Sequence, residues 1–346
     1  MTDIKSLPLL SLQDALASDE KPYRARQIYE WLHKHLVESF SEMTNLSRAT
    51  RTYLVENFEL PVFTLEKMQE SAFDGTRKYL FALADGNLIE SVLMKYKHGN
   101  SVCISSQAGC RMGCTFCASA IGGLNRSLTA GEMLEQIYAI TRNTNERVSN
   151  VVVMGIGEPL DNYDELLNFI KILSDYNGLN LSQRNITVST CGLSPEIYRL
   201  ADEMLQINLA ISLHATTDEK RLKLMPVTKA YPLDELMKAC KYYFKKTGRR
   251  ITFEYSLINN INDSKEDAME LKDLILRFRK QERLLPCHIN LIPLNPVKEH
   301  DFCASPAKNV LDFKNILEKY QINVTIRREM GSDIDGACGQ LRRTNA

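Results

Sequence analysis

The spacing of hydrophobic positions predicts helices in the first part of the chain. Ile28, Leu32 and Leu36 follow one another at i, i+4 and i+8, which places them on one face of a helix. Residues 46–60 show the same period, so we expect a further helix there. The pattern therefore predicts a small helical N-terminal domain over residues 1–60.

A change to β character follows over residues 61–100. Three short runs rich in β-branched and aromatic residues are separated by turn signals. Each signal is an Asp-Gly pair, which favours a tight turn between two strands. The runs are Val62–Leu65, Lys78–Leu83 and Leu88–Tyr96, and the turn signals are Asp74-Gly75 and Asp85-Gly86. We interpret this stretch as a short antiparallel β connector.

From residue 101 onward, strand-like segments alternate with helical ones. The expected strands are Ser101–Ser106, Val151–Gly155, Asn185–Ser189, Asn208–Ser212, Ile251–Leu257 and His288–Leu294. Six strand–helix units predict an α/β fold with a parallel sheet, a partial (β/α)6 barrel resembling a TIM barrel. We expect this core to span residues 101–330, followed by a C-terminal segment over residues 331–346.

Helix starts support the alternation. Thr129 stands three residues before Glu132, and Ser264 stands three residues before Asp267, which is the spacing of reciprocal N-terminal capping. Both pairs precede apolar periodic segments, so we expect helices to begin directly after Thr129 and Ser264.

Composition narrows the class of protein. A chain of 346 residues with 44% hydrophobic residues buries a large core of its own, so no partner protein is required for the fold. No window approaches the roughly 18 apolar residues of a membrane helix, and no apolar run follows a basic flank at the start. We expect a soluble cytoplasmic protein that makes no contact with a membrane.

Charge gives no general support for nucleic-acid binding, because 43 basic residues balance 43 acidic ones. Any RNA-binding surface must therefore be local. Short basic pairs that suit phosphate contacts are Lys245-Lys246, Arg249-Arg250, Arg327-Arg328 and Arg342-Arg343, although such pairs are commonly solvated surface.

Three of the nine cysteines stand close together in a CxxxCxxC pattern. Cys110, Cys114 and Cys117 lie within eight residues, and Gly109 and Gly113 allow the loop to fold tightly. A [4Fe-4S] cluster usually takes four thiolates, so three would leave one iron open to a ligand. The alternative is a closed structural zinc site in which Cys103 supplies a fourth thiolate.

The position of this motif, directly after the first strand of a βα repeat, resembles the radical S-adenosylmethionine (SAM) superfamily. In that superfamily SAM binds the open iron, and an electron from the cluster cleaves it to a 5′-deoxyadenosyl radical. Four further segments resemble the RlmN family, whose members methylate C2 of adenine in 23S rRNA and tRNA. These segments are Cys103–Cys110, Met154–Leu160, Ser212–His214 and Asp333–Leu341.

The resemblance implies roles for residues outside the cluster. A first SAM would methylate Cys338, and a radical from a second SAM would take a hydrogen from the S-methyl group, so two SAM are used per turnover. The methylene radical would add to C2, and Cys103 would resolve the adduct by forming a transient disulfide with Cys338. Glu90 matches the position of the proton acceptor.

The resemblance also implies a SAM pocket. Gly157 and Glu158 would meet the aminoacyl end of SAM, and Ser189, Ser212, Leu213, His214 and Asn295 would line the rest. Independently of the family, each of these residues falls at or just past the end of an expected strand, where barrel active sites gather. A dinucleotide loop at Gly155-Ile-Gly157 is disfavoured because the third glycine is absent.

Two rival interpretations stay open. The related Cfr group methylates adenine C8 with the same parts, but it tends to have Ala where Pro159 follows Glu158 here. A non-catalytic zinc-containing RNA-binding protein would need the cysteine loop but not Cys338.

The resemblance further implies 23S rRNA and tRNA as partners and an external electron donor such as a flavodoxin system. By analogy, the N-terminal domain would dock the RNA.

Overall fold

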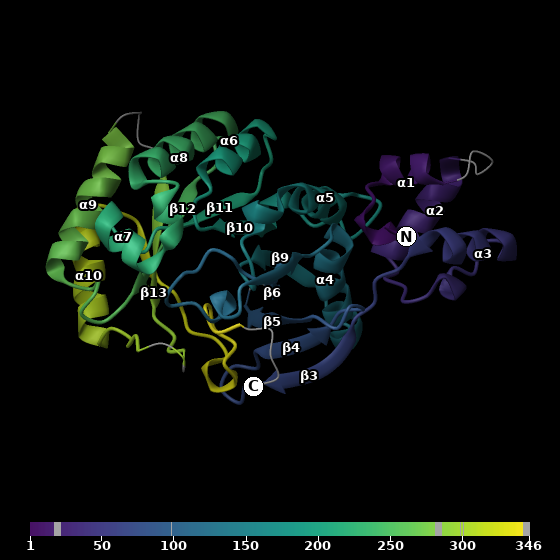
Figure 1. The fold of residues 1–346 in the computed structure, drawn as a ribbon, viewed down its shortest axis with the longest axis horizontal. Coiled ribbons are helices and arrows are strands. Elements are labelled where there is room, and N and C mark those ends of the chain that lie inside the picture. The colour runs from purple at the N-terminus through teal and green to yellow at the C-terminus, as the bar shows by residue number, and fades with distance from the viewer. Residues whose placement is uncertain (17–21, 98, 281–285, 298, 300, 342–346) are drawn as a thin grey trace.

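The helical N-terminal region lies at one end of the molecule (Figure 1). The computed structural model describes residues 1–16, 22–97, 99–280, 286–297, 299 and 301–341. The region contains α1 (Leu9–Ala15), α2 (Pro22–His33) and α3 (Arg48–Asn57). The predicted helix over residues 46–60 is therefore shorter than expected. Its last residues form β2 (Phe58–Glu59), which pairs in parallel with β1 (Thr2–Asp3).

A long mixed sheet forms the body of the protein. In the described residues it has the order β14-β13-β12-β11-β10-β9-β6-β5-β4-β3. The strands are β3 (Thr64–Glu70), β4 (Arg77–Ala82), β5 (Leu88–Tyr96), β6 (Gly99–Ile104), β9 (Val148–Val153), β10 (Ile186–Thr190), β11 (Asn208–Ser212), β12 (Ile251–Leu257), β13 (Cys287–Pro293) and β14 (Val324–Ile326). All pairings from β6 to β14 are parallel, which confirms the predicted α/β core.

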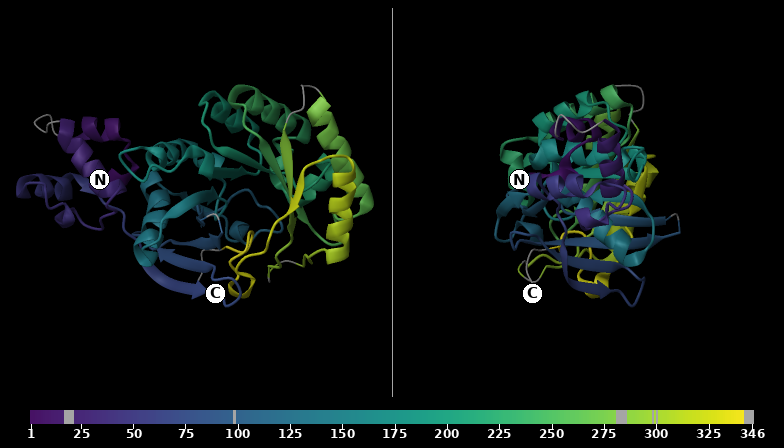
Figure 2. Two further views of the ribbon diagram at one scale, coloured as in Figure 1. Left: turned by 180° about the vertical axis from the view of Figure 1, so that it is seen from behind. Right: turned by 90° about the vertical axis from the view of Figure 1, so that its right-hand side faces the viewer.

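Helices cover the outer face of the curved parallel part (Figures 1 and 2). They are α4 (Ala130–Thr144), α5 (Tyr163–Ser174), α6 (Ser194–Asp202), α7 (Asp218–Leu224), α8 (Leu233–Thr247), α9 (Lys265–Lys280) and α10 (Ala307–Lys319). The capping predictions are confirmed: Thr129 and Glu132 form a capping box at the start of α4. Ser264 and Asp267 bond reciprocally at the start of α9, at 3.1 Å in each direction.

Four details of the strand prediction need correction. Strands β6 and β9 begin two and three residues earlier than expected, and each ends two residues earlier. The first connector strand begins at Thr64 and runs to Glu70, instead of spanning residues 62–65. Among the described residues a seventh parallel strand, β14, follows the six that were expected. A small hairpin of β7 (Gln107–Gly109) and β8 (Leu124–Ser127) was also not predicted. Strands of three or four residues carry too short a hydrophobic pattern to be recognised from sequence.

The connector strands β3 to β5 continue the main sheet. β5 pairs antiparallel with β6, and this register sets Val92 opposite Cys103. The C-terminal segment lies near these strands in both views, between them and β13 (Figures 1 and 2). Residues 61–100 therefore supply one wall of the space into which the C-terminal segment folds.

Buried polar contacts fix the N-terminal region to α4. Lys5 and Glu135 are both fully buried and form an ion pair at 2.5 Å, and Arg142 contacts the other oxygen of Glu135. His33 lies 2.8 Å from the hydroxyl of Tyr138. Because buried charges are costly unless they are paired, these contacts favour one docking arrangement. In the described part of the chain, no helix is long and apolar enough to cross a membrane.

Candidate active site

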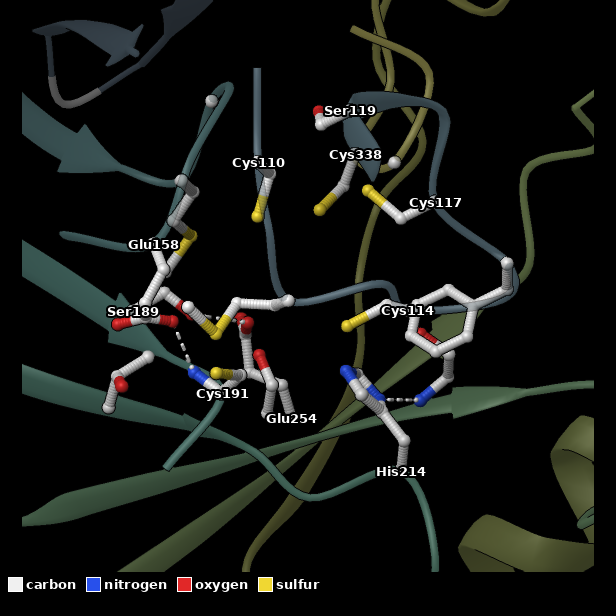
Figure 3. A pocket seen from close by; sticks show the side chains of 18 of the residues that line it. Cys110, Cys114, Cys117, Ser119, Glu158, Ser189, Cys191, His214, Glu254 and Cys338 are labelled. Carbon is white, nitrogen blue, oxygen red and sulfur yellow. Dashed lines mark hydrogen bonds between the residues drawn. The ribbon is translucent and has the colours of Figure 1, made fainter. Parts of the chain in front are cut away.

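A cavity opens where the parallel strands end, beneath the cysteine loop (Figure 3). It holds about 980 Å³ of space free of atoms, a figure that includes open solvent at its mouth. Its lining includes Cys110, Met112, Cys114, Phe116, Cys117, Ser119, Met154, Gly157, Glu158, Ser189, Cys191, Ser212, His214, Glu254, Ser256, Asn295, Cys338, Gly339 and Leu341. The β7–β8 hairpin, the strand ends and the C-terminal segment thus meet at one place.

The cysteine loop is shaped by Gly109, whose φ of +86° lies in the left-handed region. A Cβ at this position would stand 2.0 Å from the carbonyl oxygen of Gly123, so no other residue fits. The amide of Cys110 then donates to the same carbonyl at 3.2 Å. This turn sends the chain from β7 directly into the CxxxCxxC segment.

The three loop thiols point into the cavity (Figure 3). Burial raises the pKa of the Cys110 thiol to about 12 and also raises the pKa values of Cys114 and Cys117. The thiols are thus neutral on their own, and a metal that binds them has to displace their protons. Among the described residues, no three His, Cys, Asp or Glu side chains are grouped as ligands of a single metal ion.

The C-terminal segment brings Cys338 among the loop cysteines (Figure 3). The amide of Ala118 donates to the carbonyl of Gly339 at 2.8 Å, and the Ser119 hydroxyl donates to the carbonyl of Leu341 at 2.8 Å. The amide group of Asn295 donates to the carbonyl of Cys338 at 3.1 Å. Hydrogen bonds to the backbone of the C-terminal segment, donated by the loop and by Asn295 just after β13, therefore hold Cys338 in place.

The same segment is bound from its other side by the connector strands. Asp333 accepts from the amide of Ala72 at 2.9 Å, and Asp74 accepts from the amide of Gly331 at 3.1 Å. Lys78 reaches the carbonyl of Asp335 at 3.4 Å. The segment thus spans the gap between the connector and the cysteine loop.

Glu90 lies beneath the C-terminal segment, where that segment spans the gap between the connector and the cysteine loop. Its carboxylate is buried and forms an ion pair with Lys78 at 3.2 Å. Glu90 is not among the residues that line the cavity of the cysteine loop. The pairing of β5 with β6 places it on the same sheet face as Val92 and Cys103, with Lys78 between it and the C-terminal segment.

A second, smaller cavity contains both of the remaining predicted cysteines. Cys103 and Cys338 line it together with Met154, Asn295 and Arg327. Burial raises the pKa of the Cys103 thiol to about 12. The two thiols predicted to form a transient disulfide therefore share one space, although no disulfide is formed in the described residues.

Gly157 and Glu158 form the turn after β9. At Gly157, φ is +105° and a Cβ would stand 2.6 Å from the Cβ of Gln107, so the position requires glycine. The Glu158 carboxylate accepts from the amide of Cys191 at 2.7 Å and from the amide of Leu160 at 3.0 Å. Burial raises the pKa of this carboxyl, and its bond with Cys191 connects the turn after β9 with the end of β10.

His214 has its ring in the cavity wall and its backbone in the left-handed region at φ +55°. The amide of Ser256 donates to Nδ1 at 2.9 Å, so Nε2 carries the ring proton. Burial lowers the pKa of His214 to about 3, which keeps the imidazole neutral. Phe116 meets the ring edge-on with 5.1 Å between centroids.

The other predicted pocket residues separate into two groups. Ser189, Ser212 and Asn295 line the cavity. Leu213 is fully buried and is absent from the cavity lining, while its amide donates to the carbonyl of Glu254 at 2.9 Å. Leu213 therefore supports the turn between Ser212 and His214 from the core.

Comparisons with known proteins give consistent matches. Residues 104–271 match the radical SAM superfamily, and residues 3–60 match the ribosomal RNA large subunit methyltransferase N-terminal domain. A probable dual-specificity RNA methyltransferase RlmN of Lachnoclostridium phytofermentans is 56% identical over 99% of this chain and 94% of its own length. That of Geobacillus kaustophilus is 52% identical over 99% and 93%.

A solved structure agrees with these matches. The radical SAM methyltransferase from Sphaerobacter thermophilus superposes with a TM-score of 0.93 at 42% identity, covering 99% of this chain and all of the other. The chain belongs to the RlmN family. Like other members of the radical SAM superfamily, it is an enzyme that uses a [4Fe-4S] cluster and SAM.

Within this RlmN-family site, sequence reasoning missed three charged residues, of which Arg221 and Glu254 are buried and Arg327 is partly buried. Arg221 is fully buried in α7 and donates to the carbonyls of Cys191, Ser212 and Leu213 at 2.6, 3.1 and 3.1 Å. Glu254 lines the cavity from β12, and Arg327 follows β14. The pair at residues 327–328 was predicted as a phosphate contact or solvated surface, and its position at the cavity of Cys338 is not evident from the sequence.

The remaining basic pairs have different surroundings. Arg249 bonds to Asn208 at 2.6 Å, while Lys245, Lys246 and Arg250 are exposed. The pair Arg342-Arg343 lies outside the described residues. Hence, of the basic pairs that the structure describes, only residues 327–328 lie at the cavity of Cys338.

Proposed function

We propose that this RlmN-family enzyme methylates C2 of an adenine in 23S rRNA and in tRNA, with Cys338 as the carrier of the methyl group. The observation that supports this most directly is the placement of Cys338. It lines one cavity with the three loop cysteines and a second cavity with Cys103. A thiol that meets a cofactor on one side and a resolving thiol on the other suits a carrier.

The residues present fit the two cofactors. Cys110, Cys114 and Cys117 are the proposed ligands of the [4Fe-4S] cluster, and their thiols line a cavity instead of forming a group around a single ion. Gly157, Glu158, Ser189, Ser212, His214 and Asn295 are the proposed contacts of SAM, with Leu213 supporting them. When bound, the cluster supplies the electron that cleaves SAM to a 5′-deoxyadenosyl radical.

The chain's own thiols then have separate tasks. Cys338 accepts a methyl group, loses a hydrogen atom from it, and forms a carbon–carbon bond to C2. The adduct radical gives up one electron to the external electron carrier and the proton of C2 to a general base. Cys103 then attacks the sulfur of Cys338, the carbon–sulfur bond breaks with its electron pair on the carbon, and a proton added there completes the methyl group. A disulfide remains between the two cysteines. This order accounts for two SAM per turnover, one as methyl donor and one as the source of the radical.

Glu90 is the proposed acceptor of the proton that leaves C2. Its burial and its position beside Lys78, under the C-terminal segment, support a role near Cys338. Lys78 balances the charge of the carboxylate, so a small movement that separates the pair would free the base. Glu90→Gln is therefore expected to allow methylation of Cys338 but to slow release of product.

RNA docking is proposed for the N-terminal region, whose residues 3–60 match a domain found in ribosomal RNA methyltransferases. Arg26 and Arg48 are exposed there. Replacing both by Gln is expected to weaken binding of a 23S rRNA fragment without changing iron content. Unchanged affinity would exclude this region as the RNA-docking surface.

An external donor such as a flavodoxin supplies the electron, and the enzyme acts in the cytoplasm.

The function is tested by incubating the iron-reconstituted protein without oxygen with reductant, methyl-labelled SAM and a 23S rRNA fragment. Nucleoside mass spectrometry is expected to detect labelled 2-methyladenosine. The product 8-methyladenosine would place the chain with the Cfr group instead. Bound zinc with no product would support the non-catalytic alternative. Cys338→Ala should give no product, while Cys103→Ala should retain RNA covalently attached to Cys338.

A further inference from the structure

Arg327 occupies the interior of the barrel beside the two reactive thiols. It follows β14, and its amide donates to the carbonyl of Leu291 in β13 at 2.8 Å. Its side chain lines the cavity shared by Cys103 and Cys338. The side chain is about a quarter exposed, so it faces open space within the barrel.

One nitrogen of the Arg327 guanidinium, Nη1, donates no hydrogen bond within the described residues. Nη1 is buried, and it lies 3.7 Å from the Glu254 carboxylate, which is beyond hydrogen-bond reach. Among the described residues no atom accepts a hydrogen bond from it. A buried donor without a partner is costly, so its retention needs a reason, and a ligand that accepts the bond supplies one.

The charge of Arg327 also acts on the thiols. Burial raises the pKa values of Cys338 and Cys103, and the Arg327 guanidinium offsets part of that rise at both. Independently of this charge effect, Arg327, Cys103 and Cys338 all line the same cavity, so the guanidinium and the two thiols face one space. A base that receives a carbon from Cys338 must therefore lie close to Arg327.

The space beyond Arg327 suits a polar ligand. Arg327, Met94 and Tyr96 line both the cavity of Cys338 and a further cavity that reaches the starts of the strands. In that further cavity Asn150, Asn208 and Thr187 contribute to the lining, where large barrels usually pack apolar side chains. A nucleotide therefore has both room and hydrogen-bonding groups on this side of Cys338.

We propose that Arg327 is a further catalytic residue, whose guanidinium donates a hydrogen bond to a ring nitrogen that flanks C2 of the target adenine. The proposal rests on the proposed function. C2 lies between N1 and N3, and both nitrogens accept hydrogen bonds. A donor on either nitrogen withdraws electron density from C2 and makes that carbon more receptive to the carbon radical on Cys338.

The movement of electrons during the addition explains why a fixed hydrogen-bond donor helps. In forming the carbon–carbon bond, one electron of the carbon–nitrogen π bond pairs with the radical's electron. The other π electron remains on the flanking nitrogen and the ring. Arg327 keeps its protons throughout, and its positive charge stabilises the electron density gained by that nitrogen.

The test is a cycle of variants and RNA analogues. The holoenzyme and its Arg327→Gln variant are compared on 23S rRNA fragments that carry adenosine, 1-deazaadenosine or 3-deazaadenosine at the target position. With adenosine, the variant is expected to lose about 100-fold in kcat/KM. With the analogue that lacks the bonded nitrogen, wild type and variant should be nearly equal. The alternative result is that the substitution and each analogue lower kcat/KM independently, so that the effect of both together is the product of the two separate effects. If that holds for 1-deazaadenosine and for 3-deazaadenosine, Arg327 does not contact the base.

Binding without turnover gives an independent readout. Affinities of the wild-type and variant holoenzymes for the same three RNAs are measured without reductant. Wild type should bind adenosine more tightly than the analogue that lacks the bonded nitrogen, and Arg327→Gln should remove this preference. Equal preference in wild type and variant would overturn the proposal. Arg277→Gln removes the charge of an exposed arginine on α9 and is the matched control.

Two further measurements separate this role from others. Mass spectrometry of Cys338 should show normal S-methylation in Arg327→Gln, and loss of that methylation would mean that Arg327 acts on the thiol instead. If Arg327→Gln fails to retain iron, the cycle is repeated with Arg327→Lys, which keeps the charge. Failure of the proposed function itself is recognised separately, because wild type would then form no 2-methyladenosine from the normal RNA.

Discussion

Ser119 donates a 2.8 Å hydrogen bond to the carbonyl of Leu341, which links the end of the cysteine loop to the end of the described C-terminal segment. One residue earlier, the backbone amide of Ala118 donates to the carbonyl of Gly339 at 2.8 Å. The loop that supplies the proposed cluster ligands and the segment that carries Cys338 therefore form one unit. Disturbing either should affect the other.

Replacing Ser119 by Ala tests this connection. The loss of one buried hydrogen bond should cost about 1 kcal/mol of stability. We expect iron content to be retained and S-methylation of Cys338 to be slowed, measured by mass spectrometry of the intact protein. Ser174→Ala is the control, because the Ser174 hydroxyl donates to Ile170 and accepts from Gln183, and neither residue belongs to the cysteine loop or the C-terminal segment. A normal rate of Cys338 methylation in Ser119→Ala would show that the segment is positioned by its other contacts.

Arg221 should be needed for the SAM pocket. The side chain is fully buried and joins the turns after β10 and β11, so Arg221→Met leaves several carbonyls without partners. We expect a loss of about 3 kcal/mol in the free energy of unfolding and much weaker SAM binding by calorimetry. Lys223→Met, an exposed substitution on the same helix, should change neither quantity. Normal SAM affinity in Arg221→Met would contradict a positioning role.

Gly157 should tolerate no side chain. Gly157→Ala would place a Cβ within 2.6 Å of the Gln107 Cβ and would hold a non-glycine residue at φ +105°. We expect a loss of more than about 2 kcal/mol in stability together with loss of SAM binding. Gly86→Ala is a matched control, since Gly86 also has positive φ but no atom lies within 4 Å of the added Cβ. Similar effects of the two substitutions would mean that backbone strain alone is responsible.

His33 should make the protein less stable in acid. Burial, aided by the charge of Lys5, lowers its pKa from 6.5 to about 3, so the folded protein holds the ring neutral while the unfolded chain takes up a proton below about pH 6.5. The contribution to stability is therefore present above pH 6.5 and is lost as the pH falls toward 3.

The measurement is chemical denaturation at pH 7.5 and pH 5. His33→Gln should lose less stability between these two values than wild type does. The exposed His35 lies nearby, and His35→Gln should behave as wild type. Equal losses in wild type and His33→Gln would show that other groups cause the acid sensitivity.

Much of this architecture could be predicted from sequence because local patterns encode it. The strands β11 and β12 were predicted with their observed bounds, since continuous apolar runs bounded by turns identify buried parallel strands. The cysteine loop was recognised from its spacing, whereas the strand-end residues of the cavity were implied by the family resemblance and agree with the rule that active sites of such folds gather at the ends of strands. The predicted roles of these residues stay predictions.

What the sequence did not reveal depends on distant contacts. Arg221 and Arg327 look like ordinary helix and surface arginines, and only the packing of α7 and β14 shows that they point inward. Likewise, no local signal shows that β5 continues the parallel sheet through β6. Burial of a charge is a property of the assembled fold, so motif spacing cannot report it.

The contacts of Asp74 with Gly331 and of Asp333 with Ala72 have a consequence for how such enzymes diverge. The turn between β3 and β4 and the C-terminal segment are far apart in the chain but fit one another as a pair. A substitution in one should persist in descendants only with a compensating change in the other. Chimeras that exchange the C-terminal segment between distant relatives should accordingly work only when this turn is exchanged as well.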